Sequence, residues 1–240
     1  MKTGEFILCM KAKPFNTFVS SLLERGIMRK NILICIDRDD TLIYDHKYFL
    51  GHTKDWKNKV KILKGVVSGL RLLNKLPNTS LYMTSNQSGI AIFPNLTPKR
   101  ASIVCKYVRD ILKKKGAVLK GFIFSEYVTP EYVKQHPQYN FNPHRVRDDP
   151  WAKPHPGMIK EALKREGWKR EESRVYVIGD RATDVKSALN IQGFGILVPA
   201  TTEPHQIAKT KILMKRNKKI YIAKDFLDAA RFIVKRESSL

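Results

Sequence analysis

Two aspartates, Asp37 and Asp39, stand two positions apart directly after the apolar run from Ile32 to Ile36. Such a short run, rich in branched residues, is typical of a buried parallel strand, so both carboxylates would leave the sheet at one point. Mg²⁺ prefers oxygen ligands and keeps water and phosphate oxygens in its shell. One carboxylate could attack phosphorus, while the other protonates the leaving alkoxide and later activates water. Alone the pair is a weak signal, because a turn or a helix cap would also explain it.

Three further positions along the chain carry polar residues that suit the same chemistry. The hydroxyl of Ser85, with nearby backbone amides, could hold phosphate oxygens. Lys153 could neutralise a phosphoryl group as a compact point charge. Asp180 could supply another oxygen ligand to a cation, and Asp184 could hold Lys153 or a metal-bound water. A polar turn, a surface lysine or a first-turn aspartate would explain each feature singly, but all of them in chain order favour one site.

Strands and helices alternate from residue 31 onward, and this alternation positions the polar residues. Apolar spacing and stop signals predict strands over 32–36, 80–84, 121–125, 174–178, 195–198 and 220–223, and helices over 65–76, 97–115, 156–166, 183–190 and 225–235. Thr97 as N-cap and Pro98 at the first helical position mark one helix clearly. The pattern predicts an α/β fold, a Rossmann-like three-layer sandwich with a mostly parallel sheet. Ligands bind at the carboxyl ends of the strands in such sheets.

Two segments stand outside this alternation. Residues 1–27 show no clear periodicity, so we expect an N-terminal extension followed by one domain over residues 28–240. Residues 127–151 are rich in prolines and aromatics, and we expect a long loop there, a kind of segment that is often functional. The intervals between the four motif positions leave no room for a large cap domain. We therefore expect an open site whose specificity is set by loops.

The chain carries 45 basic and 22 acidic residues, a net charge of +23. Such a field attracts anions, including phosphorylated metabolites and nucleic acid, although a lysine-rich surface without function would explain it equally well. Cys9, Cys35 and Cys105 have no paired spacing, which argues against a disulfide framework or a cysteine zinc site and favours a reducing compartment. No apolar run approaches the roughly 20 residues that cross a bilayer, and no targeting signal is visible. We expect a cytoplasmic protein without a membrane partner.

The order of these motifs resembles the haloacid dehalogenase superfamily of phosphatases that use an aspartate nucleophile. The four segments are DRDDT at 37–41, SNQSGIA at 85–91, KPHPGM at 153–158 and GDRATD at 179–184. They are similar to the motifs of the D-glycero-D-manno-heptose 1,7-bisphosphate phosphatases and the histidinol-phosphate phosphatases. The resemblance extends from residue 29 to about residue 200.

By position, the resemblance implies a magnesium-dependent phosphatase. Asp37 would be the nucleophile and a metal ligand, and Asp39 would be the general acid/base and lend its backbone carbonyl to the metal. Ser85 and Lys153 would stabilise the phosphoryl group in transfer. The other implied site residues are a metal ligand, Asp180, and the substrate-binding candidates Asp45, His46, Tyr48, Asn86, Gln87 and Arg181.

The segment before the lysine motif departs from the family pattern. Family members usually have a zinc-binding loop there, with cysteines and a histidine. Residues 127–151 contain no cysteine, and His136 and His144 lie among prolines in the manner of surface residues. We therefore expect no structural zinc.

Two single positions also depart from the pattern. Ala152 stands where an arginine used in substrate recognition usually precedes the motif lysine, and Arg145, Arg147 or Arg181 could take its role. Asp40 replaces the usual glycine of the first motif and adds a carboxylate.

These patterns leave several functions open. The first is hydrolysis of a small sugar phosphate through a phospho-aspartate, with heptose bisphosphate as the best single candidate and histidinol phosphate as a related one. A polynucleotide 3′-phosphatase is the alternative, because that family shares the TNQ-like and KP-like motifs and the positive charge favours it. The DRD start and GDRATD resemble the sugar-phosphate branch more closely. A catalytically inactive binding protein is disfavoured because all motif residues are retained.

Overall fold

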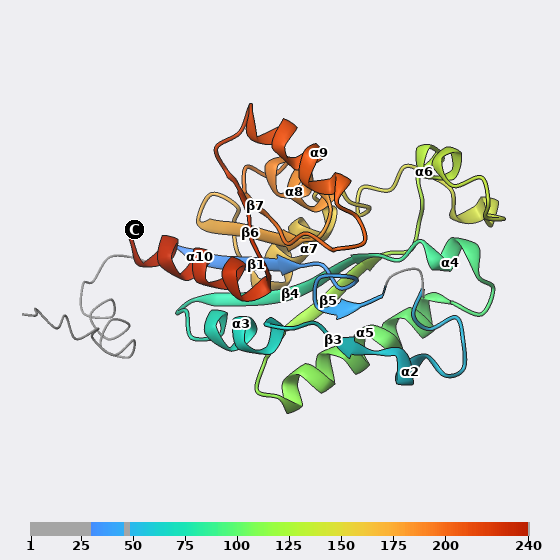
Figure 1. The fold of residues 1–240 in the computed structure, drawn as a ribbon, viewed down its shortest axis with the longest axis horizontal. Helices are drawn as coiled ribbons and strands as arrows, with labels where there is room; N and C mark the ends of the chain where they lie inside the picture. The colour runs from blue at the N-terminus through green and yellow to red at the C-terminus, as the bar shows by residue number, and fades with distance from the viewer. Residues whose placement is uncertain (1–29, 46–48, 240) are drawn as a thin grey trace, which may run out of the picture.

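The computed structural model describes residues 30–45 and 49–239 and is built on one parallel sheet (Figure 1). The strands lie in the order β5 (Gly121–Ser125), β4 (Thr79–Asn86), β1 (Asn31–Ile36), β6 (Ser173–Gly179), β7 (Phe194–Leu197) and β8 (Ile220–Ile222). Each neighbouring pair in this sheet is parallel. The predicted α/β fold with a parallel sheet is confirmed. The predicted N-terminal extension lies outside the described residues.

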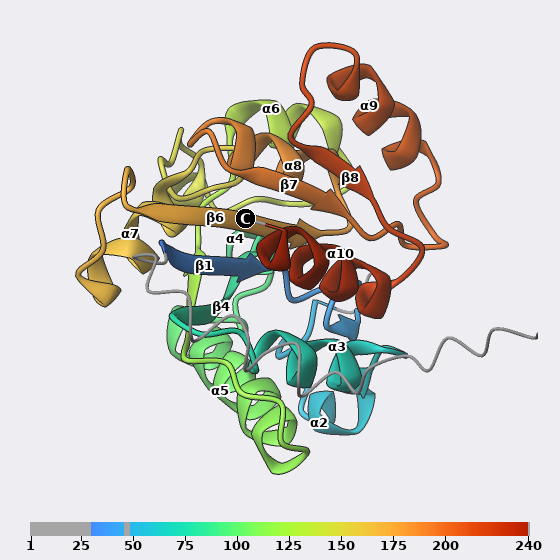
Figure 2. The same cartoon turned by 90° about the vertical axis from the view of Figure 1, so that its left-hand side faces the viewer.

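Helices cover both faces of the sheet, which produces the three expected layers (Figure 2). One face carries α3 (Val66–Leu73), α5 (Pro98–Lys114) and α10 (Phe226–Ser238), and the other carries α7 (Gly157–Glu166), α8 (Ala182–Leu189) and α9 (His205–Met214). All but α9 were predicted, with ends that differ by at most three residues. No helix in the described part of the chain is long and apolar enough to cross a bilayer.

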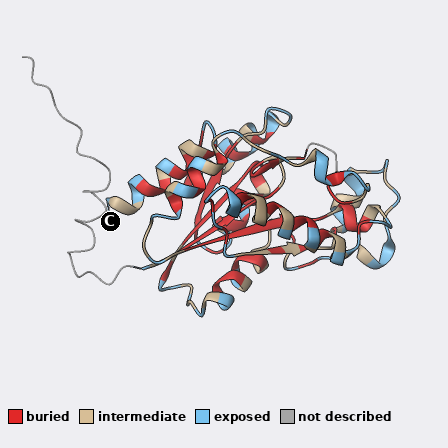
Figure 3. Ribbon diagram, turned by 90° about the horizontal axis from the view of Figure 1, so that it is seen from below, coloured by how far each residue is buried: buried red, intermediate tan, exposed pale blue. Residues whose placement is uncertain are grey.

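The central strand β1 is buried on both faces. Ile32, Ile34 and Ile36 pack in the cluster that includes α3, α5 and α10, whereas Leu33 and Cys35 pack in the cluster that includes α7. This division follows from the alternation of side chains along a strand. Figure 3 shows the strands as almost continuously buried. Polar side chains can therefore reach solvent only where the strands end.

The segment between β1 and α3 is small. It holds a two-stranded antiparallel sheet of β2 (Ile43–Tyr44) and β3 (Lys61–Ile62), and the short helix α2 (Trp56–Lys59). Trp56 is buried and packs edge-on against Tyr107 of α5, with ring centroids 5.2 Å apart. The described residues of this segment therefore form no separate cap domain.

The prediction of a long loop over residues 127–151 was wrong in part. The segment contains α6 (Pro130–Gln135) and a 3₁₀ turn, η1 (Pro143–Arg145). Thr129 caps α6, since its side chain accepts a hydrogen bond from the backbone of Tyr132 at 3.1 Å, and Pro130 occupies the first turn. This is the same threonine–proline signal that marks α5, and it was overlooked here.

The remaining unpredicted helices have weak signals in the sequence. The helices α2 and α4 (Gly89–Ile92) have only four residues each. In α9 the buried residues are the polar Gln206 and Thr210, so the apolar periodicity that reveals a helix is weak.

Candidate active site

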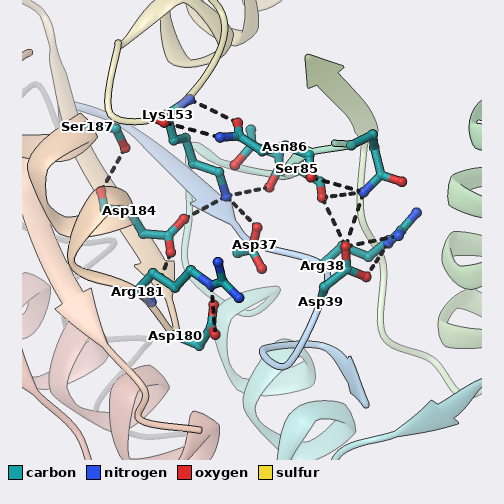
Figure 4. Close-up of polar contacts among 12 residues, drawn as sticks. Asp37, Arg38, Asp39, Ser85, Asn86, Lys153, Asp180, Arg181, Asp184 and Ser187 are labelled. Atoms are coloured by element: carbon teal, nitrogen blue, oxygen red, sulfur yellow. Dashed lines mark hydrogen bonds and ion pairs between the residues drawn. The ribbon is translucent and has the colours of Figure 1, made fainter. Parts of the chain in front are cut away.

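The candidate active site lies at the carboxyl end of the central strands (Figure 4). Asp37 directly follows β1, Ser85 lies near the end of β4, and Asp180 directly follows β6. Lys153 comes from the segment before α7, and its side chain reaches Asp37. The structure therefore brings the four sequence motifs together at one place.

Lys153 is the centre of a buried ion-pair network. Its Nζ donates hydrogen bonds to Oδ1 of Asp37, to Oδ1 of Asp184 at 2.6 Å and to the carbonyl of Thr84 at 3.2 Å. Burial acts to lower the pKa of Lys153, but the carboxylates of Asp184 and Asp37 outweigh it and raise that pKa. Lys153 therefore stays charged, and a buried, oriented ammonium group suits phosphoryl oxygens.

Asp184 reaches Lys153 because the backbone at Gly179 leaves it room. A Cβ at Gly179 would overlap the Asp184 carboxylate, so any larger residue would push this side chain away. The other oxygen of Asp184, Oδ2, accepts from the backbone amide of Arg181 at 3.1 Å and so caps α8. Of the two roles that the sequence left open for Asp184, the structure shows the contact with Lys153.

Asp37 and Asp180 are buried carboxylates that affect each other's ionisation. Burial raises the pKa of Asp180 well above its usual value, and the charges of Asp37 and Asp184 add to this effect. Burial also raises the pKa of Asp37 to about 7, although Lys153 opposes it. A divalent cation between such groups would favour both ionised forms. Because Mg²⁺ is usually held by one or two carboxylates together with water and phosphate oxygens, this donor set fits Mg²⁺.

The histidines and cysteines of the described residues do not gather into a metal site. Within residues 30–45 and 49–239, no three or more His, Cys, Asp or Glu side chains are arranged to hold a metal. Nδ1 of His136 lies 2.8 Å from the carbonyl oxygen of Tyr132, and the two rings stack with their centroids 4.0 Å apart. His144 is exposed. That the protein holds no structural zinc stays a prediction.

Asp39 is held by its neighbour Arg38. Nε and Nη2 of Arg38 donate to the two carboxylate oxygens of Asp39 at 2.7 and 2.9 Å. Oδ2 of Asp39 also accepts from Gln87 Nε2 at 3.1 Å and from the Ser85 hydroxyl at 3.4 Å. Burial acts to raise the pKa of Asp39, but Arg38 and these hydrogen bonds outweigh it and hold that pKa below its usual value.

Asp45, expected to bind substrate, is buried beside Arg38. Its Oδ2 lies 3.5 Å from Arg38 Nη2 and accepts from the backbone amide of Leu50 at 3.3 Å. Its Oδ1 has no hydrogen-bond partner in the described part of the chain. These contacts do not support a role in substrate binding. The other two candidates of this segment, His46 and Tyr48, lie outside the described residues.

Asp40 adopts the left-handed backbone conformation, with φ of +53°. This conformation favours glycine, and aspartate is among the residues that tolerate it. The Asp40 side chain accepts a hydrogen bond from the backbone amide of Asp45 at 3.1 Å. The carboxylate at this position therefore fixes the turn that leads to Asp45.

Asn86 and Gln87 were expected to contact substrate, and the structure shows what else they contact. The Asn86 side chain bonds to the backbone of Lys153. Gln87 is buried and donates to the Ser85 hydroxyl at 2.8 Å as well as to Asp39. Both residues therefore hold other members of the site in place.

The three arginines that could replace the missing family arginine have different surroundings. Arg181 is half exposed, and its guanidinium lies 3.6 Å from Asp180 and 2.7 Å from Glu203. Arg145 pairs with Glu126 at 2.8 Å. Arg147 stacks over the ring of Tyr127, 3.5 Å from its centroid. Of these three arginines, Arg181 lies beside a predicted metal ligand, Asp180.

The residue that the sequence analysis missed is Arg38. It is 1% exposed and ranks among the largest fully buried side chains of the described residues. A basic residue followed by an aspartate at a strand exit was the available signal, but only the fold shows that this arginine is buried.

The chain resembles known proteins in sequence and in fold. The family model of haloacid dehalogenase-like hydrolases matches residues 150–229. The chain is 29% identical over 194 residues to the histidine biosynthesis bifunctional protein HisB of Buchnera aphidicola subsp. Schizaphis graminum, across 80% of this chain and 47% of that protein. It therefore spans about half the length of this relative.

A second relative and a solved structure point in the same direction. The D-glycero-beta-D-manno-heptose-1,7-bisphosphate 7-phosphatase of Rhodopseudomonas palustris is 26% identical over 161 residues, across 66% of this chain and 79% of that protein. The crystal structure of D,D-heptose 1,7-bisphosphate phosphatase from B. bronchiseptica, complexed with magnesium and phosphate, superposes with a TM-score of 0.62 at 17% identity, across 85% of this chain and 98% of that one. The chain is similar to haloacid dehalogenase-like phosphatases in sequence and fold. The expected resemblance is confirmed, and the expected enzyme class, a phosphatase, is that of the heptose-bisphosphate relative.

Proposed function

We propose that the chain is a magnesium-dependent phosphomonoesterase that acts through a phospho-aspartate on Asp37. The observation that carries this proposal is the contact of Lys153 with Asp37 and Asp184 at the end of β1. A buried lysine beside a buried carboxylate provides a nucleophile next to a fixed positive charge for phosphoryl oxygens.

The residues suggest a two-step reaction. Lys153 engages Oδ1 of Asp37, which leaves Oδ2 to attack phosphorus. In the first step an Asp37 oxygen–phosphorus bond forms and the ester oxygen–phosphorus bond breaks. Asp39 must enter this step protonated, although Arg38 favours its ionised form in the free site, and it gives that proton to the leaving alkoxide. In the second step Asp39 takes a proton from water, the water oxygen bonds to phosphorus, and the bond to Asp37 breaks. Phosphate leaves, and both aspartates return to their starting forms.

Asp37 and Asp180, together with the backbone carbonyl of Asp39, would hold Mg²⁺. The ion supplies positive charge that favours the ionised form of both carboxylates and attracts phosphoryl oxygens. Ser85 stands next to Asp39 and would donate its hydroxyl hydrogen bond to a phosphoryl oxygen. These are the roles that the resemblance of the motifs implies for the same residues.

A small sugar phosphate, with heptose bisphosphate first, is the proposed substrate. The heptose-bisphosphate relative and the order of the motifs support it. The HisB relative supports histidinol phosphate as a second candidate. The net charge of +23 and the lack of a cap domain on the described residues favour a 3′-phosphorylated polynucleotide as the alternative. A sugar phosphate would place the enzyme in carbohydrate metabolism in the cytoplasm, and the free thiols of Cys35 and Cys105 are in keeping with a reducing compartment.

A substrate panel tests this proposal. Heptose 1,7-bisphosphate, histidinol phosphate and a 3′-phosphorylated oligonucleotide would each be incubated with the enzyme in Mg²⁺ and in EDTA, and phosphate release would be measured. We expect release that requires Mg²⁺ and is fastest with heptose bisphosphate. Faster release from the oligonucleotide would replace the first substrate by the alternative. No release from any phosphomonoester in Mg²⁺ would refute the reaction.

A further inference from the structure

A third charged residue, Arg38, lies between Asp37 and Asp39 at the end of β1. Arg38 is 1% exposed and makes a two-pronged ion pair with Asp39, through Nε to Oδ1 and Nη2 to Oδ2. Paired hydrogen bonds of this kind fix the plane of a carboxylate as well as its place, because the guanidinium is a rigid fork. Asp39 is therefore held in one orientation by the residue that precedes it.

The pair is buried on one side only. The Asp39 side chain is 28% exposed, whereas that of Arg38 is 1% exposed. In Figure 4, Arg38 and Asp39 lie on one side of Asp37 and Lys153 lies on the other. The Asp39 side chain is thus partly exposed at the site, whereas the arginine that holds it is not.

Arg38 is itself held by two elements that are distant in sequence. Its Nη1 contacts Sγ of Cys105 in α5 at 3.6 Å, and its Nη2 lies 3.5 Å from Asp45. Asp45 also accepts from the backbone amide of Leu50. The guanidinium therefore connects Asp39 to α5 and to Asp45, which in turn holds the backbone of Leu50.

We propose that Arg38 is a positioning residue that fixes the orientation of Asp39 for proton transfer, and that Asp45 supports Arg38 and Asp39 rather than binding substrate. The inference rests on the proposed function, in which Asp39 is the general acid. Proton transfer needs the acid within hydrogen-bond reach of the leaving oxygen, and a displacement of about 1 Å can cost about 100-fold in rate. Gln87 and Ser85 each contact a single oxygen of Asp39, so they cannot define its plane alone.

The experiment compares two leaving groups. p-Nitrophenolate leaves without a proton, whereas an alkoxide needs one, so the best alkyl phosphate of the panel and p-nitrophenyl phosphate separate proton transfer from phosphoryl transfer. For Arg38→Met we expect kcat/KM to fall about 100-fold with the alkyl phosphate and about threefold or less with p-nitrophenyl phosphate. Arg38→Lys keeps the charge without the fork, and Asp45→Asn keeps the shape. Both variants should lose more activity with the alkyl phosphate than with p-nitrophenyl phosphate, and their kcat/KM with the alkyl phosphate should fall about 10-fold.

Arg231→Met is the matched control, because Arg231 is an exposed arginine on α10. It should leave both values unchanged. Equal losses with both substrates in Arg38→Met and Arg38→Lys, or no loss in either, would overturn the proposal, because a merely structural arginine would not distinguish leaving groups. If the wild-type enzyme hydrolyses neither substrate, the proposed function fails.

A crystal structure of Arg38→Lys decides the positioning role whatever the activity is. We expect the Asp39 carboxylate to turn and lose its contact with Gln87 or Ser85. An Asp39 carboxylate in the same orientation as in the wild-type protein would refute the positioning role even if the phosphatase assay succeeds.

Discussion

The side-chain amide of Asn86 holds both backbone groups of Lys153. Its Oδ1 accepts from the Lys153 amide at 2.9 Å, and its Nδ2 donates to the Lys153 carbonyl at 3.1 Å. The two residues are 67 positions apart in the chain. This pair of hydrogen bonds joins the end of β4 to the segment that delivers the lysine, so the position of Lys153 depends on Asn86.

The first prediction concerns this pair. Asn86→Ala should lower kcat/KM by about 10- to 100-fold, because the backbone that carries Lys153 loses both hydrogen bonds and its ammonium group is no longer held in place. Steady-state kinetics with the best substrate of the panel measure the effect, and circular dichroism checks that the fold is retained.

Asn190→Ala is the control for this prediction. Asn190 donates to the carbonyl of Pro154 at 3.0 Å and is exposed, so it contacts the same segment without holding Lys153 itself. We expect less than about a twofold change. Equal effects of the two variants would mean that Asn86 does not position Lys153.

The second prediction tests the nucleophile. Asp37→Asn should abolish turnover and prevent the acid-stable trapping of labelled phosphate on the protein, because an amide does not attack phosphorus. Asp148→Asn is the control, since the Asp148 side chain is 78% exposed and pairs only with His155 among the described residues. Residual turnover by Asp37→Asn above that of the uncatalysed reaction would contradict the phospho-aspartate mechanism.

The third prediction concerns stability and pH in the absence of metal. Burial raises the pKa of Asp37 to about 7, with Lys153 opposing and Asp184 and Asp39 adding to the increase. Between about pH 4 and about pH 7 the folded state therefore holds a proton that the unfolded chain has released. The contribution of Asp37 to the free energy of unfolding falls as the pH rises through this window, and Asp37→Asn removes that dependence.

Thermal unfolding in EDTA measures this effect. The Tm of Asp37→Asn minus that of the wild type should increase from about pH 5 to about pH 8. Mg²⁺ should raise the wild-type Tm at the higher pH, because ligand binding to the folded state stabilises it. A Tm difference that does not change with pH would show that Asp37 has no raised pKa in the folded protein.

The fourth prediction concerns a carboxylate away from the site. Glu166, at the end of α7, accepts from Tyr82 at 2.6 Å, from Ser80 at 2.8 Å and from Lys120 at 2.7 Å. Glu166→Ala should lower the free energy of unfolding by about 2–3 kcal/mol, because it leaves buried donors of β4 without an acceptor. Urea denaturation measures the change.

Glu161→Ala, on the same helix, is the control for Glu166. Glu161 pairs with Arg165 one turn away at 2.9 Å, and the Arg165 side chain is 42% exposed. Such pairs contribute about 0.3–0.5 kcal/mol. If both variants lose the same stability, the three hydrogen bonds to Glu166 do not connect α7 to β4 in the way described.

The sequence predicted the parts of the site that depend on one strand exit at a time. The apolar run before Asp37 and that before Asp180 marked buried strands, and parallel strands bring their carboxyl ends to one edge. Thr97 and Pro98 marked the start of α5 to within one residue. These features were predictable because each depends on residues that are neighbours in the chain.

The features that the sequence did not reveal depend on contacts between distant residues. Arg38 was given no role from the sequence, because its contacts are with Cys105 of α5 and with Asp45. Asn86 looked like a substrate ligand because nothing in its own motif points to the Lys153 backbone. Gln206, on the buried side of α9, bonds to the backbone of Ala182 and so breaks the apolar pattern that would mark a helix.

The segment that carries α6 begins and ends at a single pairing of two valines. Val128 and Val146 form a parallel bridge, with Val128 donating to the Arg145 carbonyl at 3.0 Å and accepting from the Arg147 amide at 2.9 Å. This pairing closes the base of the segment before the chain reaches Lys153. Residues 129–145 can therefore vary in length or be grafted without a shift of Lys153 along the chain, provided that their contacts with α4, such as the hydrogen bond from the Asn142 amide to the Ala91 carbonyl at 2.7 Å, are kept.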